Sequence, residues 1–218
     1  KMYNIGFLDE EINIQASFFE TFQDEEFSVY VINVENTKSA IDVVNEINEK
    51  KLDAIIIDYK MAENGQCSFD GDEVLKAIND MKRYYPVIML TSHRKSALDK
   101  VDDYYIVKDK SIINEPNKVR ELKQTLKEVI RLYIRKIGRI ESEVRDLEEK
   151  RKNEESLSLK DEDRLNSLHY EMRAIDPDSN GIPADLLTTK RMKKLDELVC
   201  KAQNILNAIQ QKNDKVQQ

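Results

Sequence analysis

The first 115 residues alternate short apolar runs with amphipathic segments, and this alternation restricts the possible folds more than any other feature of the sequence. The runs have the β-branched and aromatic content of buried strands, and the segments between them have the apolar spacing of helices. We expect strands at 3–8, 27–34, 53–58, 86–91 and 104–107, with helices at 12–22, 39–50, 70–83 and 94–100. This order predicts an α/β fold, a doubly wound, five-stranded parallel sheet with helices on both faces.

A continuous helical pattern follows, over roughly 116–153. Its apolar residues repeat in heptad steps from Val119 to Leu147, with one stutter at Tyr133–Ile137. At about 1.5 Å per residue such a helix is on the order of 55 Å long, more than the width of a small domain. Its distal half therefore needs a packing partner of its own, and the heptad steps predict a coiled-coil seam.

Two more amphipathic segments complete the chain, near 158–175 and from about 183 onward, joined by a turn rich in Asp, Pro, Asn and Gly. Together with the long helix they predict an all-α helical hairpin or three-helix bundle. We therefore expect an α/β domain at 1–130 and a helical region at 131–218, sharing the helix of 116–153.

Charge divides the chain in the same way. The net charge of −7 is the sum of −10 over residues 1–115 and +3 over residues 116–218, which indicates two parts with different roles. No apolar run is long enough to cross a bilayer, so no membrane partner is expected. Two cysteines do not form a disulfide framework, and their number favours a reducing, cytoplasmic location.

Functional side chains follow four of the five expected strands. The carboxyl ends of strands in an open parallel sheet meet at one edge, where functional groups collect. Asp9 and Glu10 follow the first strand, Asp58 ends the third, Thr91 ends the fourth and Lys108 follows the fifth. Each alone would suit a turn or a cap, but together they fit one geometric site.

Three clustered carboxylates repel one another unless a cation compensates their charge. Mg²⁺ suits a shallow site of oxygen ligands, because it keeps several of its waters. A lysine offers a positive charge to a phosphate oxygen, and a hydroxyl donates to another. Since carboxylates that form aspartyl-phosphate are an established covalent strategy, the set predicts metal-assisted phosphorylation of an aspartate.

The same strands carry recognisable motifs, namely FLDEE, AIIIDYKM, PVIMLTS and YYIVK. Over residues 1–130 they resemble the receiver domain of two-component response regulators, a flavodoxin-like fold of the chemotaxis type. The resemblance implies that Asp58 is the phosphoacceptor, Thr91 the switch hydroxyl and Lys108 the lysine of the site.

The resemblance also implies a metal site and a switch residue. Glu10 and Asp58 would bind Mg²⁺ directly, the Lys60 carbonyl would be the third protein ligand, and Asp9 would bind through water. Tyr105, three residues before the site lysine, falls at the aromatic switch position of the family.

Several positions depart from the family pattern. Ala62 and Asp109 stand where the family usually has proline, and 63–69 looks like a longer loop after the third strand. The spacing from Thr91 to Lys108 is several residues shorter than expected. The fourth helix is therefore expected to be short or distorted, and the output surface unconventional.

The second part carries weaker signals. DPDSNG at 176–181 copies the first half of a calcium loop, but Leu187 stands where a bidentate Glu is needed, so we interpret it as a turn. The basic cluster at 190–194 is followed at once by acids, which favours a solvated helix face over a DNA-reading helix. His169 is a lone helical histidine, for which a phosphotransfer role stays open.

These observations predict a response regulator of a two-component phosphorelay. It would accept a phosphoryl group on Asp58 from a sensor histidine kinase or phosphotransfer protein, with Mg²⁺, and would not otherwise be an enzyme. Its C-terminal helices would bind a protein partner or form a homodimer. Two alternatives stay open: a phosphate sink or relay protein, and a transcription regulator that binds DNA through the C-terminal helices, although nucleic acid is not the favoured partner.

Overall fold

A computed structural model describes residues 1–34, 38–62, 67–100, 107–153 and 157–175. The chain forms two compact units. The first runs from Lys1 to Glu141 and takes up again at Ala174, and the second begins at Ser142 and includes the described residues up to Arg173. A division near residue 130 stays a prediction. Among the described residues, no helix is both long and apolar enough to span a bilayer.

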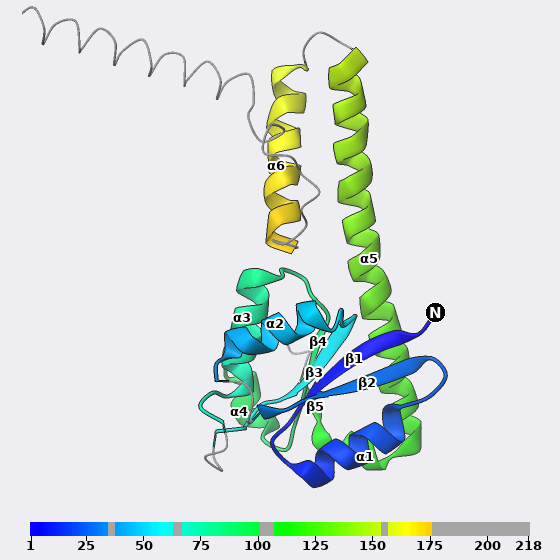
Figure 1. The fold of residues 1–218 in the computed structure, drawn as a ribbon, viewed down its shortest axis with the longest axis vertical. Helices are drawn as coiled ribbons and strands as arrows, with labels where there is room; N and C mark the ends of the chain where they lie inside the picture. The colour runs from blue at the N-terminus through cyan, green and yellow to red at the C-terminus, as the bar shows by residue number, and fades with distance from the viewer. Residues whose placement is uncertain (35–37, 63–66, 101–106, 154–156, 176–218) are drawn as a thin grey trace, which may run out of the picture. The chain divides into compact units, whose positions relative to one another are not determined.

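Five parallel strands form the sheet of the first unit, in the order β2-β1-β3-β4-β5 (Figure 1). Their bounds are β1 Tyr3–Leu8, β2 Phe27–Ile32, β3 Ala54–Asp58, β4 Val87–Thr91 and β5 Val107–Asp109. The strand order reverses between β1 and β3, which makes the carboxyl ends of these two strands the switch point of the sheet. The predicted flavodoxin-like, five-stranded parallel sheet is therefore confirmed.

Helices cover both faces of this sheet (Figure 1). One face packs against α1 (Ile12–Phe22) and the first part of α5 (Pro116–Asn153). The other packs against α2 (Ala40–Glu49), α3 (Gly71–Met81) and α4 (Arg94–Leu98). A short 3-10 turn, η3 (Lys110–Asn114), joins β5 to α5. As predicted, the fourth helix is short.

The central strand shows why the sheet is buried on both sides. All five residues of β3 are buried, and they alternate between the two cores: Ile55 and Ile57 face the α2 and α3 side, while Ala54 and Ile56 face the α1 and α5 side. Each buried isoleucine contributes about 1.5–3 kcal/mol relative to an exposed one. This packing fixes where β3 ends, and Asp58 is its last residue.

The long helix has the predicted bounds, Pro116–Asn153. In the second unit it pairs with α6 (Leu159–Ile175): the guanidinium of Arg164 donates two hydrogen bonds to the Glu143 carboxylate, each 2.6 Å long, and Lys150 Nζ lies 2.8 Å from Asp161 Oδ2. Buried apolar residues of the second unit lie on or just before α6, namely Leu157, Leu165, Leu168 and Met172. These contacts make a helical hairpin.

Several predictions fall outside the described residues. They are the turn at 176–183, the helix from 183 onward, the basic cluster at 190–194 and the switch residue Tyr105.

Candidate functional site

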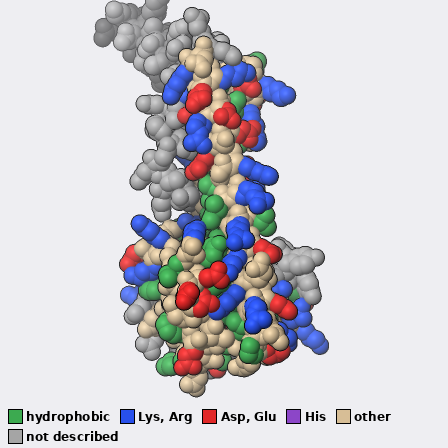
Figure 2. Space-filling view, turned by 90° about the vertical axis from the view of Figure 1, so that its right-hand side faces the viewer, with side chains coloured by type: hydrophobic (Ala, Val, Ile, Leu, Met, Phe, Trp, Pro, Cys, Tyr) green, Lys and Arg blue, Asp and Glu red, His purple; other side chains and the backbone are tan. Residues whose placement is uncertain are grey.

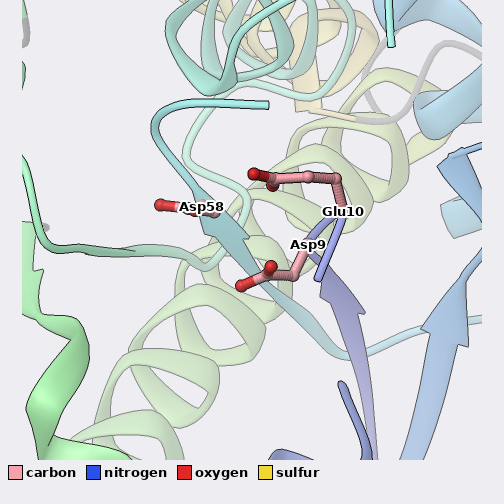
Figure 3. Close-up of side chains that lie close together, drawn as sticks. All are labelled: Asp9, Glu10 and Asp58. Carbon is pink, nitrogen blue, oxygen red and sulfur yellow. The ribbon is translucent and has the colours of Figure 1, made fainter. Parts of the chain in front are cut away.

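Three carboxylates meet at the carboxyl ends of β1 and β3, which are neighbours in the sheet. Asp9 and Glu10 follow β1 and Asp58 ends β3, as Figure 3 shows, and their side chains extend beyond the strand ends. One carboxylate oxygen from each lies within 4.8 Å of the others, and all three residues are buried. The sequence predicted this grouping, because these strands end at the switch point of the sheet.

Lys110 supplies the positive charge of this cluster. Its Nζ lies 2.7 Å from Asp58 Oδ2, 2.8 Å from Asp9 Oδ2 and 3.1 Å from Glu11 Oε1, and its side chain is only 7% exposed. An ammonium buried to this degree is retained because its carboxylate partners surround it. The carboxylates raise the pKa of the Lys110 ammonium well above its usual range, against the opposing effect of burial.

Lys108, which we expected in this position, lies elsewhere. The strand register pairs Lys108 with Leu90, one residue short of Thr91, so it lies alongside β4 and not beyond its end. Its half-buried side chain lines a pocket of about 240 Å³ together with Ile112 and Leu122. Because β5 ends at Asp109 and not at Val107, the residue that follows the strand is Lys110.

Burial raises the pKa of the Asp9 and Glu10 carboxyls, and Lys110 partly opposes this. Asp9 Oδ2 forms an ion pair with Lys110 Nζ, but the contact lacks hydrogen-bond geometry and this buried oxygen accepts no hydrogen bond. Its second oxygen, Oδ1, accepts a hydrogen bond from the Glu11 backbone N–H at 2.9 Å. Buried carboxylates with spare lone pairs are the donor set that a hard divalent cation uses, so Asp9, Glu10 and Asp58 fit Mg²⁺.

The N-terminus of α3 supports the end of β3. The Gly71 backbone N–H donates to the Tyr59 carbonyl at 2.8 Å, and a Cβ on Gly71 would lie 2.0 Å from the Asp58 carbonyl oxygen. Only glycine allows this approach. The Tyr59 backbone N–H in turn donates to Asp58 Oδ1 at 2.7 Å. Helix α3 therefore fixes the backbone that carries the Asp58 carboxylate.

Hydrogen bonds of Asp70 join the two ends of the connection between β3 and α3. Its Oδ1 accepts hydrogen bonds of 3.1 Å from the backbone N–H groups of Met61 and Ala62, and its Oδ2 lies 2.9 Å from Lys60 Nζ. Its own N–H donates to Glu73 Oε2, which completes a capping box at the start of α3. The Lys60 side chain thus points to Asp70, and its carbonyl as a metal ligand stays a prediction.

Thr91 is fully buried at the end of β4, next to β3. Its Oγ1 accepts a hydrogen bond from the His93 backbone N–H at 3.0 Å. Asp58 pairs with Leu90, so Thr91 lies one residue further toward the same edge as the carboxylates. The residue three positions before Lys110 is Val107, a buried aliphatic residue of β5.

Neither Lys110 nor Glu11 was predicted from the sequence. The short spacing between Thr91 and Lys108 was the available signal for Lys110, since a lysine two residues later lengthens it. No sequence signal set Glu11 apart from the two acids before it. His169, for which a phosphotransfer role was open, is 1% exposed, and neither ring nitrogen has a hydrogen-bond partner.

The fold and site together define an α/β receiver of the flavodoxin-like type, with an acidic cluster and a lysine at the switch point. The model of a protein family described as response regulator receiver domain matches residues 7–127, which is more than half of the chain. The chain therefore belongs to the response regulator receiver family. A search of curated proteins finds no match.

Several solved structures are similar to this chain. A chemotaxis response regulator of Vibrio cholerae is 20% identical, with a TM-score of 0.45, over 58% of this chain and 99% of that one. A receiver protein of Sinorhizobium medicae is 16% identical, with a TM-score of 0.45, over 60% and 96%. NtrX of Brucella abortus is 17% identical with a TM-score of 0.50, over 67% of this chain but only 31% of its own. At such identities the likeness concerns the fold alone.

Proposed function

We propose that this receiver accepts a phosphoryl group on Asp58 from a sensor histidine kinase or a phosphotransfer protein, with Mg²⁺ as cofactor. The observation that carries the proposal is the contact of 2.7 Å between Asp58 Oδ2 and Lys110 Nζ, within a buried carboxylate cluster. A structural ion pair needs one carboxylate, whereas this lysine faces three. Such an excess of acid suits a site that also receives a metal and a phosphoryl group.

The chemistry follows from the positions of these groups. An Asp58 oxygen forms a bond to phosphorus while the bond between phosphorus and the donor nitrogen breaks, and the donor imidazole keeps that electron pair. Lys110 is already beside the carboxylate, so it can bind a phosphoryl oxygen without a large movement. Mg²⁺, when held by Asp9, Glu10 and Asp58, would neutralise charge on the incoming group. Apart from this reaction on its own aspartate, we propose no enzymatic activity.

A surface for the phosphodonor adjoins the site. Ile12, the first residue of α1, is 76% exposed and lies two residues after Glu10 in the sequence. Phe19 of the same helix is also exposed. Large exposed apolar residues next to a buried reactive group favour contact with a protein. We propose that the phosphodonor docks on α1.

The helical region is the proposed output. The hairpin of α5 and α6 leaves Tyr170 75% exposed and also exposes Leu159, so its surface has apolar side chains for a protein partner or a second copy. Phosphorylation adds about −1.5 to −2 charge and new acceptor oxygens at Asp58. The buried Thr91 hydroxyl, one strand away, would respond to them.

Labelling tests the acceptor. Full-length protein incubated with acetyl phosphate and Mg²⁺ should gain one phosphoryl group, seen as an increase in mass. EDTA, which removes Mg²⁺, should prevent this increase. The Asp58→Asn variant should not be labelled, whereas Asp53→Asn, which removes an acid from outside the cluster, should be labelled like the wild type. Undiminished labelling of the Asp58→Asn variant would place the acceptor elsewhere.

Light scattering tests the output. The mass of the protein in solution is measured with and without beryllofluoride, a phosphoryl mimic, at several protein concentrations. A mass that rises with beryllofluoride supports phosphorylation-controlled self-association through the helices. A constant mass would restrict the output to contacts with a different protein.

A further inference from the structure

Glu11 is the third acidic residue after β1, and its side chain does not cap the helix that begins beside it. Glu11 is the N-cap residue of α1, where a side chain normally accepts a hydrogen bond from the first turn of its own helix. No such bond is present. Its Oε1 lies instead 3.1 Å from Lys110 Nζ, across the site. The carboxylate of Glu11 therefore belongs to the acidic cluster and not to the helix cap.

The backbone fixes this placement. The Glu11 N–H donates to Asp9 Oδ1 at 2.9 Å, and its carbonyl accepts from the Gln15 N–H at 2.9 Å. Both ends of the residue are thus held, one by the cluster and one by α1. The Glu11 side chain is 53% exposed, whereas that of Asp9 is fully buried, so Glu11 forms the solvent-facing rim of the site.

Glu11 changes the charge that an incoming group meets. Asp9, Glu10, Asp58 and Glu11 supply four carboxylates, and Lys110 supplies one ammonium. A bound divalent cation leaves one negative charge in excess, whereas the same set without Glu11 would be neutral. A charge at the rim acts on every anion that enters, because the interaction of unit charges a few ångström apart is only partly screened near a surface.

We propose that Glu11 determines phosphodonor specificity at this site: its carboxylate slows phosphorylation by small, highly charged donors from solution and so favours a docked protein donor over them. The inference rests on the proposed function of Asp58. A protein donor offsets the repulsion through its docking contacts, whereas a free anion has no such compensation. The contact with Lys110 also means that Glu11 must release the ammonium when a phosphoryl oxygen takes its place.

The test compares two small donors of different charge at saturating Mg²⁺. Acetyl phosphate is a dianion at pH 7.5, and phosphoramidate carries less charge. Replacing Glu11 by glutamine should raise the ratio of their initial labelling rates, acetyl phosphate over phosphoramidate, by about fivefold. Added salt should raise the acetyl phosphate rate of the wild type and have less effect on the Glu11→Gln variant. A merely structural cap would change both donors equally.

Two further variants serve as controls. Glu11→Asp keeps the charge and should keep the wild-type ratio. Glu20→Gln removes one negative charge from an exposed position further along α1 and should also leave the ratio unchanged. An unchanged ratio in Glu11→Gln, or an equal rise in Glu20→Gln, would overturn the proposal.

A binding measurement separates this proposal from the acceptor assignment. Calorimetric titration should show that Glu11→Gln binds Mg²⁺ several-fold more weakly, and that its Mg²⁺ complex binds beryllofluoride several-fold more tightly, than the wild type. Neither result requires covalent labelling. Failure of Asp58 to be labelled would therefore refute the acceptor assignment, while unchanged affinities in Glu11→Gln would refute the role of Glu11.

Discussion

Removing the ammonium of Lys110 should lower the free energy of unfolding more than removing that of Lys108, although the two lysines are only two residues apart. The Lys110→Met variant keeps most of the aliphatic stem but leaves the buried Asp9 and Asp58 carboxylates without a cation. Lys108 lies half-buried beside a pocket away from the cluster, and its replacement by methionine leaves no buried charge unpaired.

The expected loss of unfolding free energy depends on whether the unpaired carboxylates stay charged or take up a proton. An uncompensated buried carboxylate costs about 3–5 kcal/mol. Protonation limits this cost: a carboxyl with an ordinary pKa near 4 takes a proton at pH 7 for about 4 kcal/mol. We therefore expect Lys110→Met to lower the free energy of unfolding by about 3–4 kcal/mol at pH 7 without metal. Lys108→Met should change it by less than about 0.5 kcal/mol.

Urea unfolding followed by circular dichroism, in EDTA at pH 7, measures these differences. The deficit of Lys110→Met should shrink at pH 5, where protonating a carboxyl costs only about 1.4 kcal/mol. It should also shrink with added Mg²⁺, because the metal replaces the lost positive charge. Equal losses for both lysine variants, or a deficit that responds to neither pH nor Mg²⁺, would refute the assignment of Lys110 to the site.

Two other predictions concern backbone approach and a buried histidine. Gly71→Ala should lower the free energy of unfolding by about 1–3 kcal/mol and slow labelling, since its Cβ would overlap the Asp58 carbonyl oxygen. Urea unfolding measures the first effect and acetyl phosphate labelling the second. A variant that behaves like the wild type in both assays would contradict the close approach. Burial lowers the pKa of His169 in the folded protein, with Glu148 opposing and Arg151 adding to the shift. The folded state then binds the proton less readily than the unfolded state, so stability should fall as the pH drops below about 6.5. A His169→Leu variant should lose this part of the pH dependence in urea unfolding at pH 5.5 and 7.5, and an unchanged pH slope would show that the histidine titrates as freely as in the unfolded chain.

The sequence predicted those strands and helices whose buried apolar residues follow a regular pattern. The five residues of β3 are buried on both faces, so they form an apolar run that ends visibly at Asp58. The long helix was predictable because its apolar residues keep helical spacing from Val119 to Leu147, which covers most of Pro116–Asn153. The three carboxylates were predictable for a related reason: each stands where a buried strand ends.

The site lysine was not predictable from pattern alone. The strand β5 has only three residues and Val107 is its single buried one, so its apolar run does not mark its end. A shift of two residues keeps the alternation of side chains intact, and the hydrophobic pattern therefore does not distinguish Lys108 from Lys110. The register with β4, a long-range pairing, decides between them. The contact of Glu11 with Lys110 joins residues 99 positions apart and likewise has no local signature.

The three hydrogen bonds that Asp70 accepts make the connection between β3 and α3 a suitable place for an insertion. Because Lys60, Met61 and Ala62 are tied to the first turn of α3, both ends of the segment between them are held together whatever its length. Each doubling of such a closed loop costs only about 0.6 kcal/mol. The chain can therefore be lengthened here, next to Asp58, at little cost. A peptide inserted between Ala62 and Cys67 should therefore leave the acceptor strand as it is.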